Sequence, residues 1–266
     1  MKIAVCIKQV PDTDNVKIDR KTGTLRRSEV PGILNPADLT AIRMAARLKK
    51  EAEEKGEETS LTAITMGPPA ACEVLREAMA RGADKGILLC DRAFAGGDTW
   101  ATSLVLSEAV KKAGGFSVIF AGKQTTDGET GHVGPQLAEH LKMAQVTGTF
   151  QVSLDSGLTV KRIFDGSLET IECRTPAVIV CTGIDGGFQS LPIGRICDAY
   201  EKPLTVWGLR ELGMTERETG RNGSKTEVRR TFMPESSAKG IMLQGNLDEM
   251  ARTLAEKLVK GKGSEY

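Results

Sequence analysis

The chain has 266 residues, enough for one large domain or for a domain with appendages. Its 36 Lys and Arg residues nearly balance its 35 Asp and Glu residues, so no net field attracts a polyanion and we expect no nucleic acid as a partner. The N-terminal residues enter an apolar strand without a charged leader or a long hydrophobic segment, so we expect no secretion signal, no membrane span and a cytoplasmic location.

The cysteine and histidine content argues against a metal centre. The six cysteines include no CxxC pair, and the two histidines are His132 and His140. Because structural metal sites are built from clustered cysteine and histidine ligands, we expect no metal site here. We interpret the cysteines as small residues of the hydrophobic core.

From Lys2 to about Thr182, short apolar strands alternate with amphipathic helices. This alternation predicts right-handed crossovers and a mostly parallel, doubly wound sheet of flavodoxin-like α/β type. The expected strands are residues 3–7, 61–66, 86–90 and 118–120. The expected helices run from Pro36 to Lys55, from Ala70 to Arg81, from Thr99 to Lys112, and from the region of Pro135 to Leu141.

Two helix starts carry clear capping signals. Asn35 stands before Pro36 at the first helical position, and Asp38 places an acid in the first turn. Asp98 is expected to cap the helix that begins at Thr99. The long connection over residues 9–34 contains a plausible hairpin at 19–23, and a connection of this length is expected to be functional or to face a partner.

After Leu141 the pattern changes to short β-rich runs over residues 146–154, 158–163 and 168–174, which predict hairpins. The apolar run 177–181 is expected to return to the main sheet as a buried strand. From residue 183 the chain is polar and rich in turn residues, so we expect an extended arm with little core. Its last part resembles a capped amphipathic helix with Leu247, Met250, Leu254 and Leu258 on one face.

The segment from Val118 to Leu141 is the most informative part of the chain. It predicts a buried strand, a polar loop with four glycines, and a helix with Pro135 at its first position. Glycines allow close backbone approach, and the N–H groups at a helix start favour an anion. A nucleotide is therefore the first hypothesis and a plain structural turn is the alternative, because the spacing matches neither common phosphate-binding motif.

The loop side chains offer further contacts to such a ligand. Gln124, Thr126, Asp127 and Thr130 could bind a ribose or a pyrophosphate, although an aspartate in a turn often binds its own backbone. The four loops that follow the strand ends, residues 8–11, 65–68, 92–99 and 122–134, are expected to meet at one crevice, where open parallel sheets bind ligands. Lys8, Arg92 and Lys123 are candidate cations near the ligand, with a solvated side chain as the alternative for each.

Several longer motifs carry a family resemblance. They are KQVPD at residues 8–12, NPAD at 35–38, REAMARGADKGILL at 76–89, AGKQTTDGETGHVGPQLAEHL at 121–141 and VKRIFDGSLETIECRTPAVIV at 160–180. Over nearly its whole length the chain resembles the beta subunit of electron transfer flavoprotein. The resemblance implies a heterodimer with an alpha subunit that carries FAD. It also implies a nucleotide-binding α/β domain over residues 1–182, with a hairpin region at 145–175, and a recognition loop, arm and partner-packing helix over 183–266.

The resemblance is greatest to the electron-bifurcating type, on the motifs DGETGHVGP at residues 127–135 and DRAFAGGDTWATS at 91–103. In that type the beta crevice holds a second FAD that accepts electrons from NADH, whereas the common type holds structural AMP. The implied electron partners are an acyl-CoA dehydrogenase-type flavoenzyme and, as a second acceptor, ferredoxin or flavodoxin. The chain would then oxidise NADH only within the heterodimer, and no catalytic acid or base is expected in it. A nucleotide-binding regulatory module is the alternative from another class.

The resemblance also implies which residues contact the cofactor. Leu191 matches the apolar residue that docks on the dehydrogenase, while a stretch at 184–192 replaces the family's NEPRY motif and puts that partner in doubt. Asp98, Thr99 and Ala101 would lie toward the flavin end of the ligand. The implied contacts are Cys6, Lys8, Asn35, Thr65, Met66, Gly67, Asp98, Thr99, Ala101, Gly122, Lys123, Gln124, Thr126, Asp127, Gly128, Thr130, Gly131, His132, Val133 and Gly134.

Overall fold

The computed structural model describes residues 1–12, 31–155, 157–183, 190–229, 240 and 242–261. By its internal contacts the chain divides into two compact units, residues 1–227 and residues 228–266. The hairpin expected at 19–23 and the stretch 184–189 lie outside the described residues. None of the helices in the described part of the chain is both long and apolar enough to cross a membrane.

The first unit is built on a nine-stranded sheet with the order β11-β5-β4-β1-β6-β10-β7-β8-β9. The strands from β11 to β7 run parallel, whereas β7, β8 and β9 pair antiparallel. Their bounds are β1 (Lys2–Cys6), β4 (Ser60–Met66), β5 (Lys85–Leu89), β6 (Val118–Gly122), β7 (Ala144–Leu154), β8 (Leu158–Phe164), β9 (Ser167–Cys173), β10 (Ala177–Cys181) and β11 (Leu204–Trp207).

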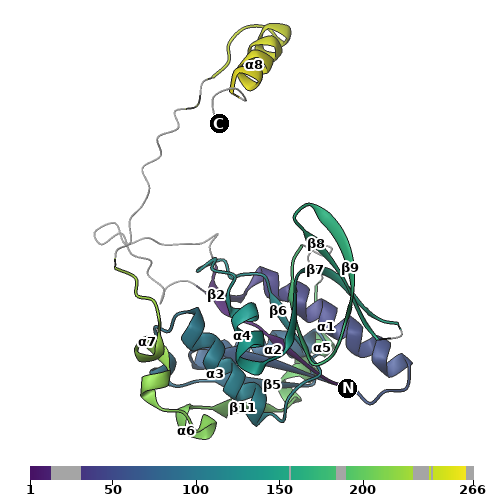
Figure 1. The fold of residues 1–266 in the computed structure, drawn as a ribbon, viewed down its shortest axis with the longest axis vertical. Coiled ribbons are helices and arrows are strands. Elements are labelled where there is room, and N and C mark those ends of the chain that lie inside the picture. Colours follow the sequence, from purple (N-terminus) through teal and green to yellow (C-terminus); the bar gives the residue numbers. More distant parts are fainter. Residues whose placement is uncertain (13–30, 156, 184–189, 230–239, 241, 262–266) are drawn as a thin grey trace. The chain divides into compact units, whose positions relative to one another are not determined.

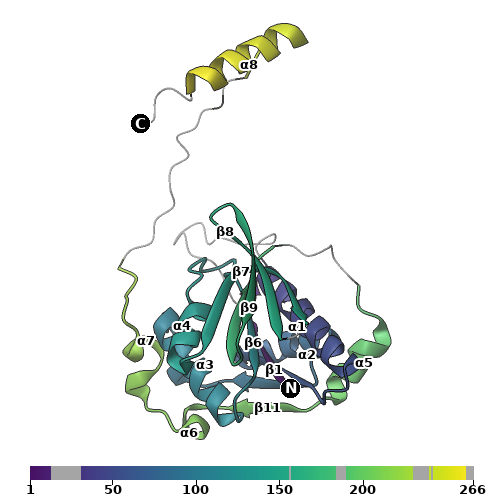
Figure 2. The same ribbon diagram turned by 45° about the vertical axis from the view of Figure 1, so that its right-hand side comes forward.

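Helices cover both faces of the parallel strands, as Figure 2 shows. On one face lie α1 (Pro36–Glu54), α2 (Cys72–Ala80) and α5 (Ile193–Glu201), and on the other lie α3 (Thr99–Lys112) and α4 (Val133–Leu141). Alternate residues of each strand enter the two cores: in β1, Val5 joins the α1 side and Ala4 the α3 side. The predicted doubly wound α/β fold is therefore confirmed.

The antiparallel strands form an extension at one edge of the sheet (Figure 1). The expected hairpins are present as β7, β8 and β9, and the expected return strand is β10, which pairs with β6 and β7. The turn between β8 and β9 leaves Ile163, Phe164 and Leu168 exposed. Two short strands missed by the sequence analysis, β2 (Gln9–Pro11) and β3 (Gly32–Leu34), pair antiparallel at the two ends of the long connection.

The segment after residue 190 contributes more to the body than its composition indicates. The strand β11 extends the main sheet by pairing with β5, and α5 packs on α2. Short elements α6 (Leu209–Leu212), η5 (Glu216–Glu218) and α7 (Gly220–Gly223) follow, so the compact unit ends at residue 227 and not near 182. The four-residue strand is hidden in the sequence because it is short and none of its residues is buried; pairing with β5 alone makes it a strand.

The second unit contains α8 (Leu247–Gly261), which begins with reciprocal bonds between Asn246 and Glu249. The predicted capping box is thus formed, with the main-chain N–H of Glu249 at 2.9 Å from the Asn246 side-chain oxygen. Leu247, Leu254 and Leu258 on this helix are exposed.

Candidate functional site

The carboxyl ends of β1, β4 and β6 lie side by side at the centre of the sheet. Cys6 of β1 stands opposite Ile64 of β4 on one side and Ala121 of β6 on the other. The order of the parallel strands reverses between β1 and β6, because α1 and α2 cover one face and α3 and α4 the other. The glycine loop, residues 123–132, therefore begins at the switch point where sheets of this class bind ligands.

The start of α1 holds this loop through the side chain of Asn35, which is fully buried. The Asn35 amide nitrogen donates to the carbonyl of Gln124 at 3.0 Å, and its oxygen accepts from the N–H of Thr126 at 3.3 Å. Asn35 does occupy the position before the helix, but its side chain makes no cap hydrogen bond. The predicted side-chain cap is therefore wrong, because the loop competes successfully for the same polar atoms.

Asp38, in the first turn of α1, is the buried carboxylate of the site. Its oxygen accepts from the N–H of Lys8 at 2.8 Å, and it is also hydrogen-bonded by the N–H of Gly122 and the side chain of Asn35. Burial raises the pKa of Asp38 to about 7, although these hydrogen bonds and the Lys8 ammonium act in the opposite direction. Asp38 thus joins the ends of β1 and β6. The sequence analysis missed this role because a first-turn acid is also explained by the helix dipole.

The close approach of Gly122 to Asp38 and Ala37 is enough to explain why this position is glycine, without a ligand. A Cβ at Gly122 would lie 2.2 Å from the Asp38 carboxylate oxygen and 2.8 Å from the carbonyl carbon of Ala37. A third buried polar residue of the same helix, Thr40, donates to the carbonyl of Gly183 at 2.9 Å. The first turns of α1 therefore bind three strand-end segments, after β1, β6 and β10.

Lys8 and Asp127 pair with each other across the mouth of the sheet. The Lys8 ammonium lies 2.8 Å from both oxygens of the Asp127 carboxylate. Lys8 and other hydrogen bonds lower the pKa of Asp127, against a raising effect of burial that is the largest single contribution. The sequence analysis considered each residue alone, as a cation or as a ribose contact, and did not predict the pair because they are far apart in the chain.

Two further glycines shape the loop in different ways. A Cβ at Gly134 would lie 2.6 Å from Cγ2 of Val180, so this glycine lets α4 pack closely on β10. Gly131 has φ +67, in the left-handed region that glycine adopts at little cost. Helix α4 begins at Val133, so Pro135 is its third residue and not its first, still within the turn whose N–H groups lack intrahelical partners.

The outer surface of the loop is open. Residues 126–130 are exposed, as are Lys123 and His132, although the Asp127 side chain is turned toward Lys8 and is only 23% exposed. His132 precedes α4 and its side chain makes no cap hydrogen bond to the first turn of the helix, in which Val133 and Gly134 have N–H groups and Pro135 has none. These N–H groups and the exposed loop form a surface that suits an anion.

The end of β4 presents a buried hydroxyl to the same region. Thr65 is fully buried and its Oγ1 has no hydrogen-bond partner. Met66 and Gly67 follow at the strand end, half-buried, with the Gly67 N–H donating to the carbonyl of Leu89. On β1, burial raises the pKa of Cys6 to about 12, with the Asp38 charge as a second cause, so the thiol stays neutral at physiological pH.

The predicted flavin-end residues lie after β5, at a distance from the glycine loop. β4 and β1 separate β5 from β6, which corresponds to about 14 Å at the usual spacing between strands. Asp98 caps α3, as predicted, through a 2.9 Å bond from the N–H of Ala101. The side chain of Ala101 is buried, whereas Thr99 is half-buried and Arg92 is exposed.

Leu191 and three of the cysteines can also be compared with their predicted positions. Leu191 is half-buried and packs against the core on the α1 and α2 side. Cys6 and Cys181 are buried as expected, but Cys197 on α5 is exposed, so its assignment to the core is wrong. The sequence analysis expected an extended arm over this segment and did not predict the helix that carries Cys197.

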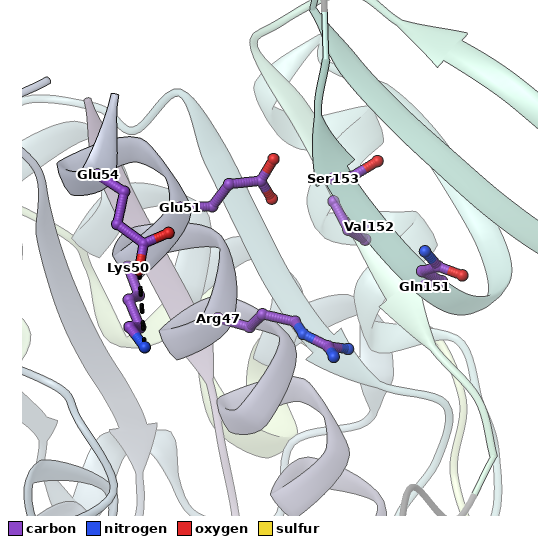
Figure 3. A pocket seen from close by; sticks show the side chains of 7 residues that line it. All are labelled: Arg47, Lys50, Glu51, Glu54, Gln151, Val152 and Ser153. Carbon is purple, nitrogen blue, oxygen red and sulfur yellow. Dashed lines mark ion pairs between the residues drawn. The ribbon is translucent and has the colours of Figure 1, made fainter. Parts of the chain in front are cut away.

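A separate hollow of about 410 Å³ lies between the last turns of α1 and β7 (Figure 3). Arg47, Lys50, Glu51 and Glu54 line it from the helix, and Lys50 pairs with Glu54 at 3.6 Å. The hollow lies at the C-terminal end of α1, whereas Asn35 and Asp38 lie at its N-terminal end. Because its charged side chains are exposed or paired on the helix, the hollow is distinct from the mouth of the sheet and adds nothing to it.

Comparison with known proteins agrees with this architecture. Residues 22–186 match the family model described as electron transfer flavoprotein domain. The caffeyl-CoA reductase-Etf complex subunit CarD of Acetobacterium woodii is 42% identical over 97% of this chain and 98% of its own length. The acryloyl-CoA reductase electron transfer subunit gamma of Anaerotignum propionicum is 39% identical, with 98% of each chain covered.

A third relative carries the subunit name itself. The electron transfer flavoprotein subunit beta of Clostridium acetobutylicum is 37% identical over 97% of this chain and 98% of its own. Both the family model and the full-length relatives agree with the resemblance found from the motifs. The chain belongs to the electron transfer flavoprotein family and corresponds along its whole length to the family's beta subunits.

Proposed function

We propose that this protein is the beta subunit of a cytoplasmic heterodimeric electron transfer flavoprotein and binds FAD at the mouth of β1, β4 and β6. In this proposal the bound flavin accepts electrons from NADH. It passes them through the FAD of an alpha subunit to an acyl-CoA dehydrogenase-type flavoenzyme, with ferredoxin or flavodoxin as the second acceptor.

The observation that carries the proposal is the way the glycine loop is supported. Asn35 binds the loop main chain from the buried side, while residues 126–130 are exposed as whole residues. A loop that served only as a turn would not need a fully buried amide beneath it, since burying polar groups costs free energy unless they are paired. The support is explained if the loop must keep one shape for a ligand.

The polar atoms around the loop fit an adenine dinucleotide. The start of α4, where His132 makes no side-chain cap, offers the N–H groups of Val133 and Gly134 for a diphosphate, and Thr65 at the end of β4 has a buried hydroxyl without a hydrogen-bond partner among the described residues. The region after β5 lies about 14 Å along the sheet edge, where the second half of a dinucleotide would extend in this proposal. AMP, the alternative ligand, would fill only the part near the glycine loop.

The chain's residues would position and tune a flavin rather than perform chemistry of their own. When bound, the flavin supplies the hydride and single-electron chemistry. Lys8 is neutralised by Asp127, so Lys123 and Arg92 are the remaining cations of those predicted here that could stabilise a reduced, anionic flavin. The two relatives named for acyl-CoA reductases support a partner of that class.

Cofactor analysis of the purified heterodimer tests the proposal directly. After denaturation, released FAD and AMP are counted for each heterodimer by chromatography. Two FAD and no AMP are expected, whereas one FAD and one AMP would establish the AMP-bound alternative. Failure of the chain to purify with any flavin-bearing partner would favour the regulatory module and contradict both.

A further inference from the structure

The loop between β5 and α3 contains two aspartates, Asp91 and Asp98, that use their oxygens in the same way. One oxygen of each binds the chain locally: Asp91 accepts from the N–H of Ala93 at 3.0 Å, and Asp98 from that of Ala101 at 2.9 Å. The other oxygen, Oδ2, of each aspartate accepts a hydrogen bond from a main-chain N–H more than 100 residues later in the sequence. The loop therefore receives the C-terminal part of the first unit at two points.

Asp98 makes the stronger of these two attachments. Its Oδ2 accepts from the N–H of Lys225 at 2.8 Å, and from the N–H and the hydroxyl of Thr226 at 2.9 and 3.0 Å. Its own N–H donates to the Ser224 hydroxyl at 2.8 Å. Asp91 accepts only one bond from the later segment, from the N–H of Leu209 at 3.0 Å.

Close main-chain packing reinforces the attachment at Asp98. Gly220 has φ +53, and a Cβ there would lie 2.2 Å from the carbonyl oxygen of Ala93. A Cβ at Gly97 would lie 3.4 Å from the Cα of Gly220. The two backbones thus meet at glycines, immediately before the residues that Asp98 binds.

Asp98 binds the last residues of the first compact unit. The first compact unit ends at residue 227, one residue after Thr226, and the second unit begins at residue 228. We propose that Asp98 is a positioning residue whose carboxylate anchors residues 224–226, the root of the C-terminal arm, on the β5–α3 loop and so sets where the arm begins toward the partner subunit. In this proposal the Asp98 carboxylate has a structural role at the root of the arm, whereas the sequence analysis considered it only as a helix cap and a cofactor contact.

The substitution Asp98→Asn distinguishes the roles of the two carboxylate oxygens, because it keeps one oxygen and replaces the other. Asparagine is as good as aspartate at a helix N-cap, so its amide oxygen keeps the bond to Ala101. Its NH₂ group would replace Oδ2 and face three donors from Lys225 and Thr226. Asp91→Asn is the matched control. It makes the same chemical change at the aspartate that binds Leu209 and leaves the bonds of Asp98 to residues 224–226 intact.

Hydrogen exchange in the full chain gives the first readout. The amides of Lys225 and Thr226 should exchange at least about tenfold faster in Asp98→Asn, because one lost hydrogen bond to a charged group shifts local opening by about that factor. They should keep the wild-type rate in Asp91→Asn. Gly220→Ala should speed their exchange by an independent route, since its Cβ cannot fit against Ala93. Unchanged exchange in Asp98→Asn would overturn the proposal.

Two further readouts distinguish anchoring from other roles. The dissociation constant for the alpha-type subunit should rise about tenfold in Asp98→Asn and stay at the wild-type value in Asp91→Asn. Loss of nucleotide with the root amides still protected would show that Asp98 is a ligand group. Faster exchange with unchanged partner affinity would refute the positioning role.

The affinity measurement rests on the proposed heterodimer, but the exchange measurement does not. If the wild-type chain binds no alpha-type subunit, the proposed function fails while the exchange rates at residues 225 and 226 still decide whether Asp98 is the anchor.

Discussion

Asp38 is a carboxylate that the fold retains at a cost. It is almost completely buried, and burial raises its pKa to about 7. The folded chain therefore binds this proton more tightly than the unfolded chain does, for which the ordinary value of 3.8 applies. Such a perturbed group is typical of functional sites, where a shape must be held even when a neutral residue would be more stable.

The pH dependence of stability follows from this shift. Because the folded pKa is raised, the contribution of Asp38 is most favourable at low pH and is lost as the pH rises from about 4 to about 7, by up to about 4 kcal/mol. The unfolding free energy of Asp38→Asn should lack this pH-dependent contribution. Urea unfolding between pH 4.5 and 8 measures it, with Asp165→Asn at the exposed β8–β9 turn as control. A variant that keeps the wild-type slope would contradict the assignment.

The sequence placed several polar residues at the strand ends but did not predict which residues they bind. The NPAD motif was recognised as a helix start, but whether an asparagine side chain binds its own helix or a loop 90 residues away depends on the tertiary structure. Lys8 and Asp127 were each considered alone for the same reason. Local patterns give the position of a polar residue, whereas its partner comes from the fold.

At the scale of elements, the packing of α4 on β10 controls the position of the glycine loop. The helix can approach the strand only because Gly134 lacks a Cβ, which would otherwise lie 2.6 Å from Val180 Cγ2. Because α4 follows the loop directly, a shift of the helix moves the loop as well.

Gly134→Ala should therefore destabilise the chain by about 1–3 kcal/mol through overpacking and should weaken nucleotide binding. Val180→Ala in addition removes the clashing methyl group and should restore part of the lost stability, as a double-mutant cycle would show. Gly128→Ala is the control, since its Cβ would make only an ordinary 3.5 Å contact with Thr125 Oγ1. Equal effects of the two alanine substitutions would contradict this account.

The elements differ in how far their sequences determined them. The sequence predicts long helices such as α1 and α3 correctly, because their apolar residues recur over several turns. It also predicts strands such as β6 and β10 correctly, because nearly all their residues are apolar and buried. The strands β2, β3 and β11 have three or four residues each, and pairing alone makes them strands. No sequence window of that length contains enough information to find them.

At the scale of the molecule, the two units differ in what they bury. The first unit contains both hydrophobic core clusters, whereas the described part of the second unit leaves Leu247, Leu258 and Val259 of its own helix α8 exposed. An amphipathic helix with its apolar face uncovered is stabilised when another surface covers it. We expect that surface to be the alpha-type subunit.

Leu254→Ser combined with Leu258→Ser should therefore weaken heterodimer formation by at least about tenfold. The same change should leave the urea midpoint of the unpartnered chain within about 0.5 kcal/mol of wild type, since these side chains are exposed. Titration with the alpha-type subunit measures the first effect and urea unfolding the second. Arg252→Gln, a polar change on the same helix, is the control; a similar loss in that variant would argue against an apolar contact.

The uncovered helix also has a consequence for the life of the protein in the cell. Chaperones and proteases act on chains that display apolar segments, so a copy synthesised in excess of its companion polypeptide is expected to be degraded sooner than an assembled one. Balanced production of the two polypeptides would then be enforced after translation, by turnover of whichever copies of this chain are left over.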